Sequence, residues 1–278
     1  MQNQLKIKNR TISLEKPLVM GVLNLAPDSF YDGGFYKDEK GFLSRVGKML
    51  EEGADIIDIG AVSTRPGAED VKLEDEINRL IPTVRKIAQE FPEAVLSVDT
   101  YQSEVARKAI DAGAHIINDI SGGVFDPKML QSIAQLKVPY ILMHIKGTPK
   151  NMQQNPVYSD VVKEIIDFFK KQLSKLKDLG VTDNIILDPG FGFGKSLEDN
   201  YTLLRNLSFF KKLDYPLLVG ISRKSMINKV LGTKPSEALN GTTVIHTLAL
   251  LNGANILRVH DMKEALEVVE LMEVYNGN

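Results

Sequence analysis

Cysteine is absent from the 278-residue sequence, and its absence excludes several kinds of chemistry. A chain without cysteine forms no disulfide, holds no thiolate-bound metal and offers no thiol nucleophile. The four histidines show no metal-ligand spacing, so a zinc site is not expected. This composition is best explained by a cytoplasmic enzyme.

Long apolar runs and a strong net charge are also lacking. No stretch of about eighteen residues is free of charged and strongly polar side chains, and residues 1–16 lack the apolar core of a signal peptide. A formal net charge of −2 gives no overall field that would attract nucleic acid or an acidic membrane. We therefore expect a soluble protein whose partners include neither nucleic acid nor membrane.

Short β-branched runs alternate with longer amphipathic segments from residue 17 onward, a pattern typical of parallel strands linked by helices. Strands are expected at 17–23, 55–60, 95–99, 115–120, 138–144, 184–188, 216–221 and 255–260. Helices are expected at 39–52, 73–90, 103–112, 127–136, 159–179, 197–212, 235–252 and after residue 261. Eight strand–helix units in about 250 residues favour an α/β fold of the (β/α)8 TIM-barrel type over an open sheet.

Nothing in the composition marks an internal domain boundary. We expect one domain over residues 1–278, with an N-terminal β-hairpin in 1–16 and the barrel in 17–278. The hairpin is expected because two short alternating segments flank the polar pair Asn9 and Arg10.

Every expected strand ends in, or runs into, polar residues. In a parallel barrel these ends meet at the C-terminal mouth, where active sites lie. Any one of these residues could be a helix cap, but an unpaired buried carboxylate or amide is costly, so Asp99, Asn118 and Asp188 predict mutual pairing or a polar ligand. Carboxylates accept paired hydrogen bonds from a flat heterocycle with adjacent N–H donors.

The last two strand ends carry cations instead of acceptors. Arg223 and Lys224 follow the seventh strand, whereas Arg258 and His260 share one face of the eighth. Barrels of this class often bind phosphate there. We therefore expect an anionic group opposite the heterocycle, and among the histidines we expect a function only for His260.

The glycine-rich segment 190–196 is similar to two nucleotide-binding motifs but matches neither. A phosphate-binding loop would need glycine where Pro189 stands, and the dinucleotide fingerprint would need one at Lys195. We interpret the segment as a flexible loop that exposes Phe193, followed by a helix whose first turn is capped by Ser196 and Asp199.

Ordered motifs from Val19 to the last expected helix resemble those of the dihydropteroate synthase family. They are MGVLNLAPDSFYDGG at 20–34, DIGAVSTRPGA at 58–68, SVDT at 97–100, INDISGG at 117–123, LMH at 142–144, DPGFGFGK at 188–195, SRKS at 222–225 and RVH at 258–260. The resemblance implies a transferase of folate biosynthesis that joins 6-hydroxymethyl-7,8-dihydropterin pyrophosphate to p-aminobenzoate. It also implies a homodimer and competition by sulfonamides.

At matching positions the resemblance implies a role for each site residue. The residues that would bind the pterin and its pyrophosphate are Thr64, Asp99, Asn118, Asp188, Lys224, Arg258 and His260, with Arg258 stacked on the ring. Those that would frame p-aminobenzoate are Phe30, Thr64, Pro66, Phe193, Lys224 and Ser225. Asn24 would bind Mg2+, the expected cofactor.

The hard step is the departure of pyrophosphate, because an aromatic amine is already a neutral nucleophile. If the C–O bond breaks first, in an SN1-like reaction, the growing negative charge needs cations and polar groups around it. The residues expected to act in catalysis are Asn24, Arg65, Lys224, Arg258 and His260.

Three positions depart from the commonest family pattern, namely Ala26, Tyr31 and Val62. Two alternatives stay open. A corrinoid-dependent methyltransferase acting on methyltetrahydrofolate would share the ring-binding positions but would not explain the SRKS run, and a non-catalytic pterin-binding barrel is favoured only by Val62.

Overall fold

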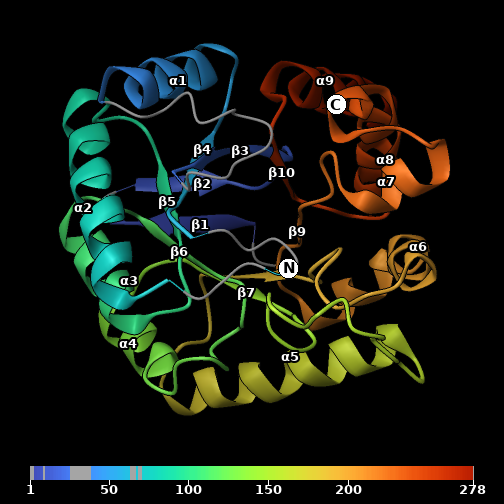
Figure 1. The fold of residues 1–278 in the computed structure, drawn as a ribbon, viewed down its shortest axis with the longest axis horizontal. Helices are drawn as coiled ribbons and strands as arrows, with labels where there is room; N and C mark the ends of the chain where they lie inside the picture. Colours follow the sequence, from blue (N-terminus) through green and yellow to red (C-terminus); the bar gives the residue numbers. More distant parts are fainter. Residues whose placement is uncertain (1–2, 9, 26–38, 63–66, 68–70, 278) are drawn as a thin grey trace.

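Eight parallel strands form one sheet inside a ring of helices in a computed structural model, which describes residues 3–8, 10–25, 39–62, 67 and 71–277 (Figure 1). The strand order is β8 (Ile185–Asp188), β7 (Tyr140–Met143), β6 (Ile116–Asp119), β5 (Leu96–Asp99), β4 (Ile56–Gly60), β3 (Leu18–Asn24), β10 (Ile256–Val259) and β9 (Leu218–Val219). A parallel bridge between Leu187 and Leu217 brings the two outer strands together and nearly closes the sheet. The predicted TIM barrel is confirmed, and each predicted strand is present.

Helices follow most strands and cover the outside of the barrel. They are α1 (Glu39–Glu51), α2 (Leu73–Glu90), α3 (Ser103–Asp111), α4 (Met129–Leu136), α5 (Val161–Asp178), α6 (Leu197–Arg205), α7 (Ser225–Leu231), α8 (Leu239–Leu251) and α9 (Met262–Asn276). Among the described residues, none of these helices combines the length and apolarity needed to cross a bilayer.

The structure differs from the predicted helices in three places. The segment 197–212 divides at Asn206 into α6 and the 3-10 helix η1 (Leu207–Leu213), and the segment 235–252 begins as the 3-10 helix η2 (Pro235–Glu237) before α8. Helix α7 was not predicted, because its seven residues are too few for a helical period to stand out. The predicted capping pair at the start of α6 is confirmed, since Ser196 and Asp199 form a reciprocal capping box.

The predicted N-terminal hairpin is present as β1 (Gln4–Ile7) and β2 (Arg10–Ser13), paired antiparallel. Leu5 and Ile7 are buried against residues near the start of the barrel strands, including Met20, Ile56 and Ile186. The hairpin therefore seals the N-terminal end of the barrel with aliphatic side chains.

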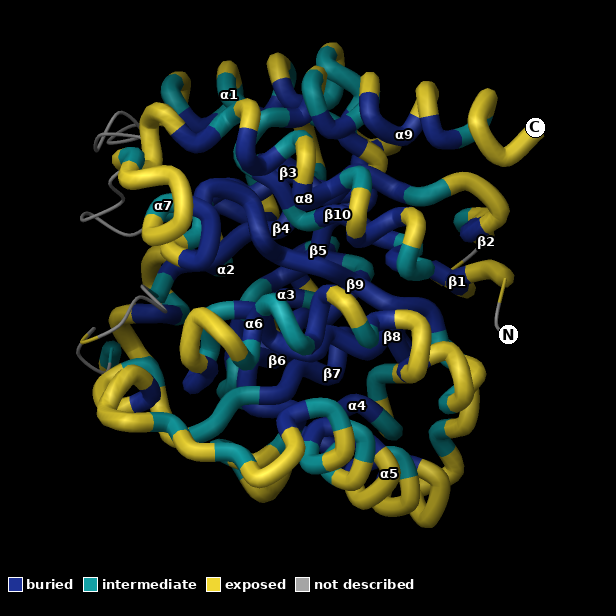
Figure 2. Tube along the Cα trace, turned by 90° about the vertical axis from the view of Figure 1, so that its right-hand side faces the viewer, coloured by how far each residue is buried: buried dark blue, intermediate teal, exposed yellow. Residues whose placement is uncertain are grey.

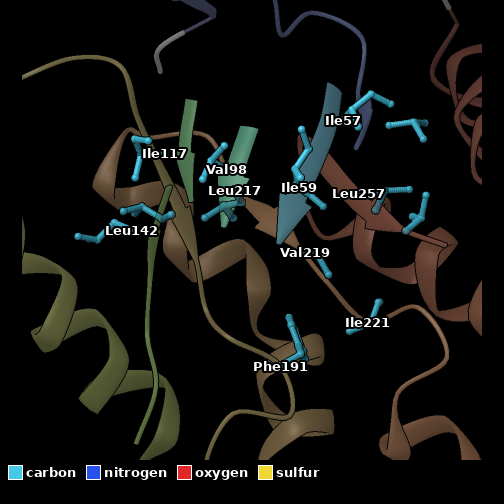
Figure 3. Close-up of a cluster of buried hydrophobic side chains, with 14 of the residues drawn as sticks. Ile57, Ile59, Val98, Ile117, Leu142, Phe191, Leu217, Val219, Ile221 and Leu257 are labelled. Atoms are coloured by element: carbon cyan, nitrogen blue, oxygen red, sulfur yellow. The ribbon is translucent and has the colours of Figure 1, made fainter. Parts of the chain in front are cut away.

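Side chains on the strands alternate between the helices and the barrel interior. The outward set, which includes Ile57, Ile59, Val98, Ile117 and Leu142, packs in the larger hydrophobic cluster (Figure 3). Figure 2 shows the strands as the buried centre and the helices as the partly exposed shell.

Inward-facing positions change from aliphatic to polar along four of the strands. In β4 the order is Ile56 then Asp58, and in β6 it is Ile116 then Asn118; β8 and β10 repeat it with Ile186 then Asp188 and Ile256 then Arg258. The period of two thus collects polar side chains at the C-terminal end, opposite the hairpin.

Candidate active site

The residues predicted to hold the heterocycle lie together at the C-terminal end of the barrel interior. Arg258 links two strands, since its Nη2 donates to Asp99 Oδ2 at 3.1 Å. Asp188 interacts electrostatically with both Lys224 and Arg258. A Cβ at Gly220 would lie 3.8 Å from Arg258 Cβ and 3.9 Å from Lys224 Nζ, so both cations lie beside this position, which directly follows β9.

Asp58 lies within the same group and was not assigned a role in the sequence analysis. It is fully buried, and its Oδ2 accepts from Asn118 Nδ2 at 3.0 Å and from Arg258 Nε at 2.7 Å. Because an ionised carboxylate only accepts, Asn118 turns its amino group toward Asp58 and its carbonyl oxygen away. The signal available in the sequence was a charged residue in the middle of a buried strand.

The other oxygen of this carboxylate, Asp58 Oδ1, is buried and has no hydrogen-bond partner within the described ranges. A buried acceptor of this kind is costly unless a donor reaches it. The group formed by Asp58, Asp99, Asn118 and Asp188 is therefore rich in acceptors, as the sequence analysis predicted for three of its four members.

Burial controls the charge state of the groups around this end of the barrel. It raises the pKa of Asp99 to about 7, against the opposing effect of the Arg258 guanidinium. Burial likewise raises the pKa of Asp188, which the Lys224 ammonium opposes. The pKa of Lys224 is lowered to about 8, because desolvation outweighs the attraction of Asp188.

Three residues predicted to frame p-aminobenzoate adjoin one another. Lys224 Nζ donates to the Phe191 carbonyl at 2.5 Å and lies 4.6 Å from the centre of the Phe193 ring. Lys224 directly precedes α7, and Ser225 is the first residue of that helix and is exposed. The prediction that Phe193 is exposed on a flexible loop was wrong: its side chain is half-buried, and the loop is hydrogen-bonded through Lys195.

Asn24 and His260 lie at neighbouring strand ends. Asn24 is the last residue of β3 and pairs in register with Gly60, which pairs in turn with Asp99. His260 directly follows β10, and its Nδ1 lies 3.2 Å from Ser222 Oγ.

The protonation of His260 follows from its surroundings. Ser222 Oγ accepts from the His260 backbone N–H at 3.3 Å and lies 3.2 Å from the ring Nδ1. Burial, with repulsion from Arg258, lowers the pKa of His260 to about 4. The ring is therefore neutral at pH 7 rather than a cation.

The sequence predicted that Arg223 helps to bind an anionic group at the mouth of the barrel, but in the structure its guanidinium is bound by other residues of the protein. Its Nε and Nη2 donate to the two oxygens of Asp261, each at 2.8 Å, and its Nη1 donates to the Pro235 and Ser236 carbonyls. This buried bidentate pair holds the segment between α7 and α8 to the start of α9. Consecutive residues thus differ in role, because Lys224 interacts with the acidic group whereas Arg223 is engaged by the protein itself.

Several predicted positions lie outside the described residues. They are Phe30, Thr64, Arg65 and Pro66, together with the departures Ala26 and Tyr31. The third departure, Val62, is described and half-buried.

Comparison with known proteins places these features in a family context. A family model described as "Pterin binding enzyme" matches residues 20–260. The dihydropteroate synthase of Escherichia coli K12 is 45% identical over 264 residues, which span 95% of this chain and 93% of that protein. A structure of the Yersinia pestis dihydropteroate synthase with a sulfonamide drug complex has a TM-score of 0.95 and 41% identity, covering 99% of this chain and 100% of that chain. The Xanthomonas albilineans enzyme in complex with 7,8-dihydropteroate has a TM-score of 0.87 and 35% identity, covering 99% of each chain.

Proposed function

The chain belongs to the dihydropteroate synthase family of pterin-binding enzymes, and from this membership we propose how its residues carry out the family's reaction. The enzyme is a transferase of folate biosynthesis that condenses 6-hydroxymethyl-7,8-dihydropterin pyrophosphate with p-aminobenzoate to give 7,8-dihydropteroate and pyrophosphate. The observation that carries the assignment of roles is the buried group of acceptors flanked by Lys224 and Arg258.

The acceptor group would bind the pterin ring. Asp99 and Asp188 offer carboxylates to adjacent N–H donors, while Asn118 offers the carbonyl oxygen that Asp58 directs away from itself. Lys224 would donate to the acceptor edge of the ring, and Arg258, held by two carboxylates, would stack on its face.

The cationic and donor groups would stabilise the departing pyrophosphate. When the C–O bond breaks, the bonding electrons move to the leaving oxygen and the positive charge spreads from the methylene into the ring. Arg258 would supply charge for the pyrophosphate oxygens, and His260, in the tautomer protonated on Nε2, would supply a hydrogen-bond donor. Arg65 and Thr64, outside the described residues, are assigned to the same side by resemblance.

Asn24 would hold Mg2+ through its side-chain oxygen, a hard ligand of the kind this ion prefers. In the described ranges no cluster of three or more histidine, aspartate or glutamate side chains could bind a metal by itself. This fits an ion that takes most of its ligands from substrate phosphates and water. When bound, Mg2+ would neutralise charge on the pyrophosphate.

The second substrate would bind beside Lys224. Phe193 offers a ring face and the Lys224 stem offers apolar contact, with Ser225 at the open edge. Phe30, Thr64 and Pro66 complete this pocket by resemblance. The amine needs no strong base, because it attacks as a neutral nucleophile and loses its proton after the C–N bond forms. Sulfonamides would compete for the same place.

Pyrophosphate release in the presence and absence of p-aminobenzoate tests this proposal. Release by the wild type should depend on the arylamine, whereas a methyltransferase or a non-catalytic barrel would show no such dependence. Asp188→Ala and Lys224→Ala should each lower kcat/KM by about 100-fold or more, because each leaves a buried polar partner unpaired. The exposed Asp167→Ala serves as the control. Full activity in either site variant would refute the assignment.

The family resemblance also implies a homodimer, and we propose that its interface lies on α7 and α8. Val244, Leu248 and Leu251 are exposed at helical spacing on α8, and Val230 and Leu231 are exposed on α7. Leu248→Glu should convert a dimer to a monomer in analytical ultracentrifugation. A wild type that sediments as a monomer would contradict the proposal. The expected cytoplasmic location stays a prediction.

A further inference from the structure

Lys195 is a buried cation beneath the loop that follows β8. Its side chain is 2% exposed, and its Nζ donates to the carbonyls of Gly190 at 2.8 Å and Phe193 at 3.0 Å. The His144 carbonyl lies at 3.3 Å and His144 Nδ1 at 3.1 Å. The ammonium is therefore surrounded by acceptors from two segments, the end of β7 and the 190–194 loop.

A buried ammonium in this place needs a reason, because desolvating a charge is costly and an apolar side chain would fill the space without that cost. Burial lowers the pKa of Lys195 to about 7, with Asp188 opposing the effect, and both the charged and the neutral amine can donate hydrogen bonds to the carbonyls. Burial and the nearby ammonium also lower the pKa of His144, so its ring is neutral and Nδ1 can accept. The local structure is arranged to accept hydrogen bonds from this lysine.

The loop itself turns tightly and closely approaches its neighbours. Gly190, Gly192 and Gly194 have φ values of 70°, 83° and 64°, in the left-handed region. A Cβ at Gly190 would lie 2.0 Å from the His144 carbonyl oxygen, and one at Gly194 would lie 2.2 Å from that of Lys146. Glycine is required at both positions, so the loop path is tightly specified.

The same loop also contacts Lys224. The Phe191 carbonyl accepts from Lys224 Nζ, and the Phe193 ring lies beside that ammonium. Lys195 Nζ donates to the carbonyls of Gly190 and Phe193, and Phe191 lies between these two residues in the sequence. The loop thus contacts two lysines, Lys195, which is buried, and Lys224, which lies at the proposed substrate site.

We propose that Lys195 is a positioning residue for the second substrate. By donating hydrogen bonds to carbonyls of the 190–194 loop, Lys195 holds the Phe193 ring and the Phe191 carbonyl next to Lys224. This inference rests on the proposed function, which assigns Phe193 and Lys224 to the p-aminobenzoate pocket. Lys195 itself contacts neither substrate. Its loss should therefore affect p-aminobenzoate more than the pterin.

The substitution Lys195→Met tests this by keeping an unbranched side chain and removing the ammonium. The KM for p-aminobenzoate should rise by about tenfold or more, while the Kd of the pterin pyrophosphate, measured by calorimetry without p-aminobenzoate, should change by less than about twofold. The control Lys175→Met removes an exposed lysine on α5 and should change neither quantity. Equal losses in both substrates, or an unchanged KM for p-aminobenzoate, would overturn the proposal.

Rescue separates positioning from general damage to the fold. Because the chain has no cysteine, Lys195→Cys introduces a single thiol, which 2-bromoethylamine converts in denaturant to a close isostere of lysine. After refolding, the aminoethylated protein should recover a KM for p-aminobenzoate close to that of wild type taken through the same cycle, and the unmodified variant should not. Failure to recover in protein with a wild-type circular dichroism spectrum would refute the role of the ammonium. If the wild type itself shows no arylamine-dependent pyrophosphate release, the proposed function fails instead.

Discussion

At the residue scale, Asp58 determines how two groups of the site are oriented. Its carboxylate accepts from Asn118 and from Arg258, so the amide carbonyl and the guanidinium plane are both held before a substrate arrives. Such pre-organisation reduces the cost of ordering these side chains on binding. The arrangement of donors and acceptors at the site therefore depends on Asp58.

Replacing this carboxylate by an amide should disturb both partners. In Asp58→Asn the new side chain can donate as well as accept, so the orientation of Asn118 is no longer fixed and Arg258 loses a counter-charge. We expect kcat/KM for the pterin substrate to fall by about 10- to 100-fold, as for loss of a charge-assisted hydrogen bond. The control Asp55→Asn makes the same exchange just before the start of β4, where Asp55 accepts from the Val19 N–H. Equal effects of the two substitutions on kcat/KM would contradict the role given to Asp58.

The raised pKa of Asp99 and the lowered pKa of Lys224 predict a narrow pH optimum. Below a pH of about 7, Asp99 is protonated and loses its negative charge; above a pH of about 8, Lys224 loses its positive charge. The kcat/KM for the pterin substrate should therefore be largest between these values and fall on both sides. Steady-state assays over about pH 5 to 10 measure this. The acid limb should change position in Asp99→Asn, where Asp188 remains as the carboxylate whose pKa burial raises, and a flat wild-type profile would refute the assignment of both groups.

At the element scale, the barrel positions the site through short loops whose glycines adopt left-handed backbone conformations. Gly194 and Gly232 have almost the same φ, 64° and 66°. They differ in surroundings, because a Cβ at Gly194 would collide with the Lys146 carbonyl whereas Gly232, which ends α7, has open space around it. Comparing substitutions at these two glycines therefore separates the effect of left-handed backbone strain from the effect of a steric clash of the added Cβ.

Alanine at these two glycines should have different consequences. Gly232→Ala should lower the free energy of unfolding by about 1 kcal/mol, from left-handed strain alone, and leave kinetics unchanged. Gly194→Ala should cost more and also raise the KM for p-aminobenzoate, because the loop that carries Phe193 must shift. Urea denaturation and steady-state kinetics of both variants provide the comparison. If both variants had the same free energy of unfolding and the same KM for p-aminobenzoate, the prediction that the clash at Gly194 displaces the loop would be wrong.

At the scale of the whole molecule, the hydrophobic cluster under the hairpin and the polar groups of the proposed site lie at opposite ends of the barrel. Leu5 is fully buried in the cluster that seals the N-terminal end, and the titratable groups of the site lie at the other end. A substitution in the seal should therefore affect folding without affecting turnover.

Leu5→Ala tests this separation. It should lower the free energy of unfolding by about 3 kcal/mol, the cost of a cavity in a packed core, while kcat and both KM values remain at wild-type levels. Ile12→Ala, at the position paired with Leu5 on β2 but only partly buried, should cost less. A change in kcat for folded Leu5→Ala protein would mean that the hairpin influences the site.

The sequence by itself determined the class of fold and most of the site. Strand periodicity places aliphatic residues at one end of the barrel and Asp99, Asn118, Asp188 and Arg258 at the other, because alternate residues of a parallel strand share a face. The same period could have identified Asp58, which lies two residues after Ile56. The motifs then indicated the family.

Only the tertiary structure decided which polar groups pair with one another and which remain for substrate. Arg223 and Lys224 are adjacent in sequence, but the approach of Asp261 engages the first and that of Asp188 the second. The sequence predicted that Lys195 belongs to a flexible loop, whereas in the structure its Nζ contacts His144, which directly follows β7. Such pairings depend on segments distant in the chain, and local propensity contains no information about them.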